Sequence, residues 1–203
     1  MPLQLSGIGG DPGDQPWDSR EFTPSAPSDD DLLTAGELLA HWWSMAVPDP
    51  EEDGDETAEL LAPFTREFPG LAPAEDRALD LDEPTSALNL LPGGRLGLVA
   101  AERPADVLSV LGWHGAVNYD HDGIALSVVL RSWEERFDAT LVGIGFDTIH
   151  LLVARPPRSL DAAQRVAAEY FAFCSDSAYQ GVGSISQLAE DLIDGAIWSF
   201  WWD

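Results

Sequence analysis

The stretch AIWSFWWD, residues 196–203, places three tryptophans and one phenylalanine within eight positions. A glycine just before it stops the preceding helical pattern, and what remains is too short for a stable helix. In a strand, Trp198, Phe200 and Trp202 point to one side and Trp201 points to the other. Burial of each large ring contributes on the order of 2 kcal/mol or more. We therefore predict a terminal strand with one aromatic face in the core.

An exposed aromatic tail is the alternative interpretation of this stretch, because exposed aromatic side chains mark binding surfaces. A second aromatic pair lies in TAGELLAHWW (34–43). On these grounds Trp42, Trp43 and Trp201 are the side chains that we predict as candidates for contact with a partner.

Two β-rich runs precede the aromatic strand, TLVGIGF (140–146) and TIHLLVA (148–154). Asp147 alone separates them, so they form either a tight hairpin or one long bent strand. The closely spaced Gly143 and Gly145 indicate a β-bulge or a close approach of the backbone.

The remaining regular elements are mostly helices. Apolar residues at three- and four-residue spacings, with capping residues before them, predict helices over 34–45, 56–68, 104–112, 122–137, 160–173 and 185–195. Pro63 must either sit inside the second of these or break it near Leu61. The short apolar run RLGLVAA (95–101) is predicted to be a buried strand.

These elements predict an α/β (α+β) fold with a small mixed sheet, packed helices and a C-terminal strand. Residues 1–55 are predicted to form an irregular acidic extension with one helix, its arm running from Gly7 to Asp31, where Gly, Pro, Asp and Ser dominate. Residues 56–203 are predicted to form a single α/β domain.

The charge of the chain is unusual. Its 203 residues include 36 acidic residues against ten arginines and no lysine, for a net charge of −26. Residues 1–92 hold 21 of the acidic residues and only 3 arginines. Such a charge opposes binding to nucleic acid and to anionic membranes, and it favours a cationic partner. A solvated acidic surface with no binding role is the simpler explanation.

Several absences narrow the class of protein. Cys174 is the single cysteine, so the chain can form no internal disulfide and no cysteine cluster for a metal. No run reaches the ~18 apolar residues of a membrane span, and the first residues lack the pattern of a secretory signal. We therefore expect a soluble cytoplasmic protein that needs no cofactor.

A family resemblance comes from five segments that occur in order along the chain. They are FPGLAP (68–73), RLGLVAAERPADVLSVLGW (95–113), VLRSWEERFDATLVGIGFDTIHLLVARPP (129–157), AAEYFAFCSD (167–176) and WSFWWD (198–203). Together they resemble the bacterial family called Domain of Unknown Function 4253 over the last two-thirds of the chain. The resemblance implies an actinobacterial-type soluble protein with a C-terminal α/β domain, and it assigns no activity to any residue.

Two groups of residues are candidates for a catalytic or a cation-binding site. Cys174 and His150 could form a nucleophile–base pair, with Asp147 or Asp176 as the orienting carboxylate, although YFAFC is typical of a buried helix end. Asp120, His121 and Asp122 could hold a cation, although a solvated loop in which Asp120 or Asp122 caps the next helix is the simpler explanation.

Two functions are compatible with the sequence. The first is a non-catalytic protein-binding module with an acidic surface, to which immunity proteins against cationic toxins are an analogy only. The second is a small-molecule enzyme in which Asp147, His150 and Cys174 converge. The lack of an assembled catalytic motif favours the first.

Overall fold

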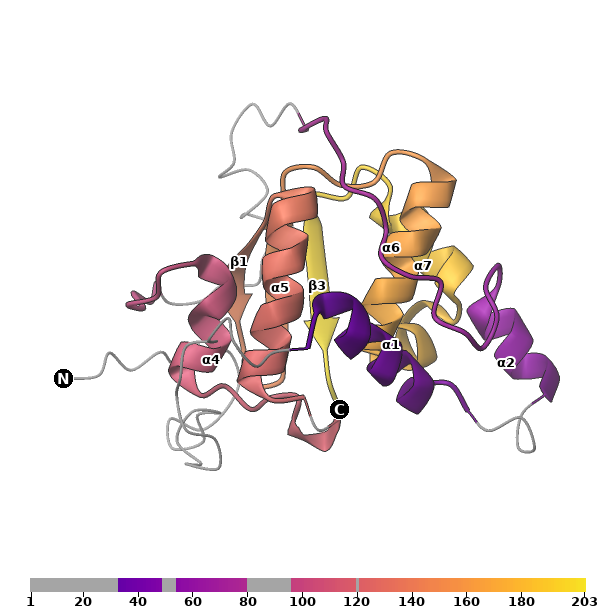
Figure 1. The fold of residues 1–203 in the computed structure, drawn as a ribbon, viewed down its shortest axis with the longest axis horizontal. Coiled ribbons are helices and arrows are strands. Elements are labelled where there is room, and N and C mark those ends of the chain that lie inside the picture. Colours follow the sequence, from indigo (N-terminus) through magenta and orange to yellow (C-terminus); the bar gives the residue numbers. More distant parts are fainter. Residues whose placement is uncertain (1–32, 49–53, 80–95, 120) are drawn as a thin grey trace.

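The computed structural model describes residues 33–48, 54–79, 96–119 and 121–203 (Figure 1). The irregular arm predicted from Gly7 to Asp31 lies outside these residues. In chain order the elements are α1 (Ala35–Ala46), α2 (Gly54–Leu61), η1 (Pro104–Asp106), α4 (Val107–Leu111), η2 (Val117–Tyr119), α5 (Gly123–Phe137), β1 (Ala139–Ile144), β2 (Thr148–Val153), α6 (Leu160–Phe173), η3 (Ser177–Val182), α7 (Ile185–Leu192) and β3 (Ile197–Trp201). The predicted α/β fold class is confirmed.

The sheet has three strands in the order β1-β2-β3. Both strand pairs are antiparallel, so within the described residues the predicted mixed sheet is wrong in this detail. β1 and β2 form the tight hairpin, with a register shift between Leu141 and Gly143. A Cβ on Gly143 would lie 2.8 Å from Cδ2 of His150, which explains why the bulge carries a glycine.

The C-terminal stretch is a strand that faces the core, as predicted. Trp198, Phe200 and Trp202 are each no more than 2% exposed, whereas Trp201 on the other face is 38% exposed. The Phe200 ring stacks on Trp133 of α5, with centroids 5.3 Å apart, and contacts aromatic rings of α6. The sheet is thus joined to α5 and α6 through aromatic side chains.

The predicted helix starts follow from side-chain caps. Thr34 and Glu37 form a capping box at α1, while Asp122, Ser159 and Ser184 accept from the first turns of α5, α6 and α7. Each of these side chains satisfies a main-chain N–H that the helix itself leaves without a partner.

Two predicted elements differ in the structure. The helix predicted over 56–68 ends at Leu61, because Pro63 cannot donate a hydrogen bond within a helix. Residues 96–101 form no strand, and Leu96 and Leu98 are 95% and 75% exposed. The short turn between β1 and β2 pairs those strands locally, whereas an apolar run by itself does not provide a pairing partner.

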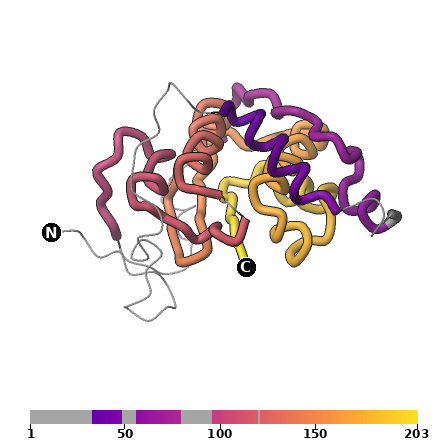
Figure 2. The backbone as a smooth tube through the Cα atoms, turned by 60° about the horizontal axis from the view of Figure 1, so that its bottom comes forward, coloured from indigo at the N-terminus to yellow at the C-terminus, as the bar shows by residue number. Residues whose placement is uncertain are grey.

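Helix α1 belongs to the same core as the C-terminal elements. It lies within the segment predicted as an extension, yet it packs on α6, where Trp43 contacts Phe171 with ring centroids 5.3 Å apart. Figure 2 shows α1 lying across the helices of the C-terminal part. In the described part of the chain, no helix is long and apolar enough to cross a membrane.

Residues 72–79 form an extended segment that we call the strap. Figure 1 shows the chain leaving α2, running along α6 and continuing past the end of α5. The strap has no helix or strand assignment, and most of its side chains are exposed.

Candidate functional site

The predicted catalytic set does not converge. His150 lies on β2 and points away from the core, because its neighbours Ile149 and Leu151 are buried. Its Nδ1 lies 2.8 Å from Oγ of Ser199 on β3. Cys174 instead lies inside the core at the end of α6, so the structure forms no Cys174–His150 pair.

Cys174 has the surroundings of a packed thiol. Its Sγ donates to the Trp201 carbonyl oxygen at 2.9 Å and accepts from Ser177 Oγ at 3.3 Å. Burial raises the pKa of Cys174 to about 11, so the thiolate needed for nucleophilic attack is scarce at neutral pH. Asp147 lies in the β1–β2 turn, and its carbonyl oxygen accepts from Trp202 N at 3.0 Å.

His121 and Asp122 of the predicted cation-binding loop have different structural roles. Asp120 lies outside the described residues. Asp122 caps α5 through a 2.7 Å hydrogen bond from Ala125 N, while His121 turns inward. Across the residues whose positions are given, no group of three or more histidine, cysteine or acidic side chains is placed to hold a metal ion.

His121 is buried against aromatic rings. It is 4% exposed, and its ring lies over Trp42 of α1 with centroids 4.0 Å apart. Nδ1 of His121 has no hydrogen-bond partner among the described residues. Burial, with a smaller contribution from nearby His41, lowers the pKa of His121 to about 4, so the ring is neutral at pH 7.

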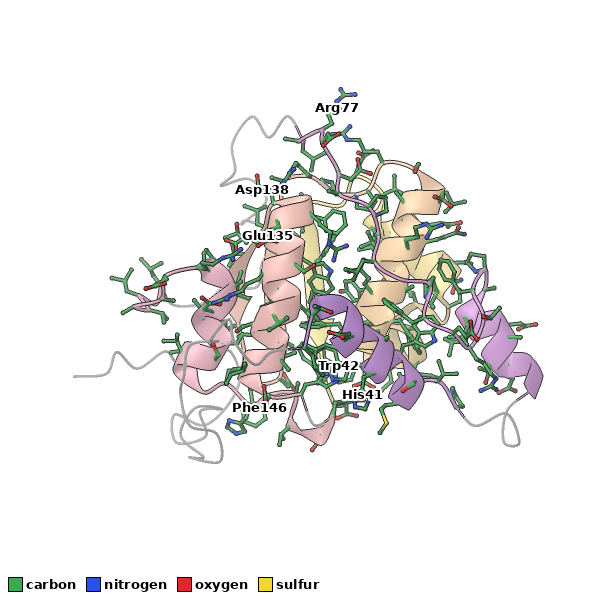
Figure 3. The ribbon with its side chains drawn as sticks, in the orientation of Figure 1. His41, Trp42, Arg77, Glu135, Asp138 and Phe146 are labelled. Carbon is green, nitrogen blue, oxygen red and sulfur yellow. The ribbon has the colours of Figure 1, made fainter. Side chains whose placement is uncertain are left out.

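The three tryptophans predicted to contact a partner differ in how far they are buried. Trp42 and Trp43 are only 6% and 1% exposed, so neither presents a surface to a partner. Figure 3 labels Trp42 on α1. The Trp43 Nε1 donates to the Arg66 carbonyl oxygen at 2.9 Å. Trp201 remains accessible on the outer face of β3.

A buried carboxylate that sequence reasoning missed is Glu169 of α6, which is fully buried. Arg136 of α5 grips it with two hydrogen bonds of 2.7 and 2.6 Å. Trp133 Nε1 and the Ala72 N–H complete its shell, at 2.8 and 2.6 Å. The sequence signal was an acidic residue on the apolar face of the helix, three positions after Val166.

Asp176, predicted as a possible orienting carboxylate for the Cys174–His150 pair, lies in a group of hydrogen bonds just after α6. Its carboxylate accepts from the Tyr119 hydroxyl at 2.6 Å, from Gln180 Nε2 at 3.2 Å and from Asp203 N at 3.0 Å. Burial and this carboxylate raise the pKa of Tyr119. Because each carboxylate oxygen already accepts a hydrogen bond, the group ties chain segments together.

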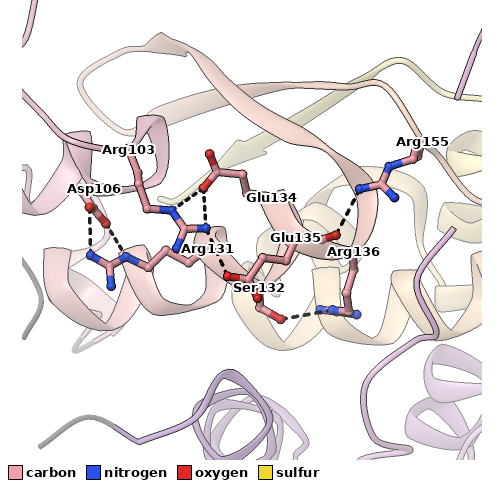
Figure 4. Close-up of polar contacts among 8 residues, drawn as sticks. All are labelled: Arg103, Asp106, Arg131, Ser132, Glu134, Glu135, Arg136 and Arg155. Carbon is pink, nitrogen blue, oxygen red and sulfur yellow. Dashed lines mark hydrogen bonds and ion pairs between the residues drawn. The ribbon is translucent and has the colours of Figure 1, made fainter. Parts of the chain in front are cut away.

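Most of the described arginines form hydrogen bonds or ion pairs with other groups of the protein. Arg103 pairs with Glu134 and Glu135, and Arg131 makes a bidentate pair with Asp106 (Figure 4). Every described arginine other than Arg77 hydrogen-bonds or ion-pairs with a carboxylate or a main-chain oxygen; these are Arg66, Arg103, Arg131, Arg136, Arg155, Arg158 and Arg165.

The accessible charge is therefore mostly carboxylate. α2 and α7 pack against each other, and Ser186 Oγ donates to the Ala62 carbonyl oxygen at 2.7 Å. Neither helix contains a basic residue, and both expose acidic side chains. We call this surface the α2–α7 acidic face; it consists of Glu56, Glu59, Glu190 and Asp191.

One open hollow of about 390 Å³ lies between the first turn of α1, Leu71 and the outer side of α5. Arg131 and Glu135 line it, and Arg131 is already bound to Asp106. The hollow therefore does not gather the predicted catalytic residues.

Comparisons with known proteins give one family. Residues 95–203, more than half of the chain, match the model described as "Domain of unknown function (DUF4253)". No curated protein and no solved structure shows significant similarity to the chain. The matched segment includes the exposed Leu96 and Leu98, helices α5 and α6, and all three strands of the sheet. The protein thus belongs to the DUF4253 family.

Proposed function

We propose that this protein is a non-catalytic protein-binding module whose acidic surface recognises a cationic partner. The observation that carries the proposal is the distribution of charge. All described arginines except Arg77 bind other groups of the protein, so the accessible charge of the described residues is carried mainly by carboxylates. A surface of one sign attracts a partner of the other sign and speeds their encounter.

The α2–α7 acidic face is the part of this surface that we assign to the partner. Its two helices carry acidic residues without any base to neutralise them. The same charge disfavours nucleic acid and anionic membranes as partners. A single buried cysteine suits a reducing compartment, and we therefore place the protein in the cytoplasm.

The experiment uses the full chain and a matched control. The wild-type protein captures its partner from native lysate at low salt, and the affinity of the purified pair is then titrated by calorimetry. We expect Glu59→Lys with Glu190→Lys to weaken binding at least tenfold. Asp76→Lys with Glu102→Lys makes the same charge change elsewhere on the surface and should weaken it less than threefold.

Salt gives an independent measure of the same proposal. Raising the salt from about 50 mM to about 300 mM should weaken binding, because exposed charges are screened over shorter distances. Failure to retain any cationic protein at low salt, or equal losses in the two double variants, would reject the assigned face.

A further inference from the structure

The strap is held almost entirely through its main chain. Ala72 N and O bind Glu169 Oε1 and Arg136 Nη1 at 2.6 and 2.9 Å. Glu75 N donates to the Arg136 carbonyl oxygen at 3.1 Å, and its own carbonyl oxygen accepts from Arg155 Nη1 at 3.0 Å.

The same pattern continues to the end of the strap. Arg158 Nη2 donates to the Ala78 carbonyl oxygen at 3.1 Å, and Leu79 N donates to the Ala154 carbonyl oxygen at 2.7 Å. Three arginine side chains thus reach carbonyl oxygens spaced three residues apart. Any extended peptide offers the same groups, so these contacts do not depend on the strap's own side chains.

Ala72 is the one buried residue of the strap. Ala72 is 2% exposed and lies between Arg136 and Glu169, whereas Pro73, Ala74 and Asp76 are exposed. A bulky side chain at position 72 would have to displace the buried ion pair. The site therefore requires a small residue there and tolerates variation at the exposed positions.

The residues that hold the strap lie in a different part of the chain from the strap itself. They span 136–169, inside the matched family segment, while the strap precedes that segment. Few buried apolar side chains fix the strap, and such segments open at a lower free energy than the core. Arg136 and Glu169 lie on α5 and α6, whereas Arg155 and Arg158 lie between β2 and α6, so the holding residues do not belong to the segment that leaves.

We propose that the groove formed by Arg136, Glu169, Arg155, Arg158 and the Ala154 carbonyl is a peptide-binding site that reads main-chain groups. Its ligand is an extended segment of a partner protein with a small residue at the position that Ala72 occupies. The strap is the resident occupant, which the partner segment replaces. This site is separate from the α2–α7 acidic face, and neither proposal depends on the other.

The test supplies the strap sequence as a separate peptide. A fluorescein-labelled peptide FPGLAPAEDRAL, matching residues 68–79, is titrated against the full chain carrying Glu75→Pro and Leu79→Pro. These changes remove two strap N–H donors and leave the groove intact. We expect binding by fluorescence anisotropy at least tenfold tighter than to the wild-type chain, where the strap competes at high effective concentration.

Two matched peptides test whether binding depends on the main-chain groups of the peptide or on its side chains. N-methylation at the Ala72 position removes the donor to Glu169 and should weaken binding at least tenfold. Replacement of the exposed Ala74, Asp76 and Arg77 side chains should change it less than threefold. Equal binding of the N-methylated peptide, or no binding to a variant that melts cooperatively, overturns the proposal.

Hydrogen exchange of the wild-type chain tests the same proposal without any substitution. The amides of Ala72, Glu75 and Leu79 should exchange at least tenfold faster than those of the buried α6 residues. Exchange of both groups at the same rate would mean that the strap leaves only on global unfolding, and it too would overturn the proposal.

Discussion

Large aromatic side chains in β3 and directly after it form part of the core. The Trp198 ring packs on Trp133 and Phe137, and the Trp202 ring packs on Trp113 and Phe173. Loss of a fully buried aromatic ring removes its apolar contacts and leaves a cavity that neighbours fill only in part.

We expect Trp198→Ala and Trp202→Ala each to lower the free energy of unfolding by about 3–5 kcal/mol. Trp201→Ala is the matched control on the outer face, and it should cost less than about 1 kcal/mol. Thermal and urea denaturation of the three variants measure these changes. Similar small losses in all three would contradict the burial of the aromatic face.

His121 gives the protein a pH-dependent stability. Its pKa in the fold is about 4, below the 6.5 of a free imidazole, so the unfolded chain binds a proton at a higher pH than the folded chain does. The contribution is fully present above pH 6.5 and is lost as the pH falls towards 4. At pH 4 the loss is about 3 kcal/mol, from 1.36 kcal/mol per pKa unit.

The measurement compares the wild type with His121→Phe, which keeps an aromatic ring and removes the titrating nitrogens. The other ionisable groups are common to both proteins, so the difference between their melting temperatures isolates His121. That difference should shift in favour of the variant between pH 7.5 and pH 4.5. A difference independent of pH would exclude a buried neutral imidazole.

At the scale of elements, the Arg136–Glu169 pair connects α5, α6 and the strap. Glu169→Ala leaves the Arg136 guanidinium, only 14% exposed, without its carboxylate, so we expect a loss of about 3–5 kcal/mol. In the double variant with Arg136→Ala the loss should be smaller than the sum of the two single losses. Urea denaturation of the four proteins completes the cycle, with the exposed Glu102→Ala as the neutral control.

How well the sequence predicts each element depends on where its signal lies. The caps at Thr34, Asp122, Ser159 and Ser184 are local patterns, and the starts of their helices were predicted within one residue. The aromatic alternation of β3 was equally direct. The 95–101 run was misassigned because a short apolar run indicates an extended chain without saying whether anything pairs with it.

The candidate site was harder to predict than the fold, because its contacts join distant parts of the chain. Glu169 binds the main chain of Ala72, 97 positions away, and no periodicity reports such a pairing. The separation of His150 from Cys174 depends on which face of β2 meets the helices. The inward face of Trp42 and Trp43 was visible in the apolar stripe of their helix, which outweighs their aromatic character as a binding signal.

At the scale of the whole molecule, the charge of −26 opposes compaction. Screening by salt reduces this repulsion in the folded state more than in the expanded chain, so stability should rise with ionic strength. We expect the melting temperature to rise between about 20 mM and about 500 mM sodium chloride, by about 2–4 °C for each kcal/mol of repulsion relieved. Scanning calorimetry at constant pH measures it, and a fall would show that exposed ion pairs dominate instead.

The order in which the sheet assembles follows from the position of β3. β1 and β2 are joined by a short turn, and hairpins of this kind form within about 1–10 μs. β3 pairs with β2 across the intervening α6, η3 and α7, since its register pairs His150 with Ser199, 49 positions apart. Closure of such a long loop is slow. During refolding we therefore expect the β1–β2 hairpin and α5 to pack together first. The aromatic side chains of α5 would then stay exposed until β3 docks.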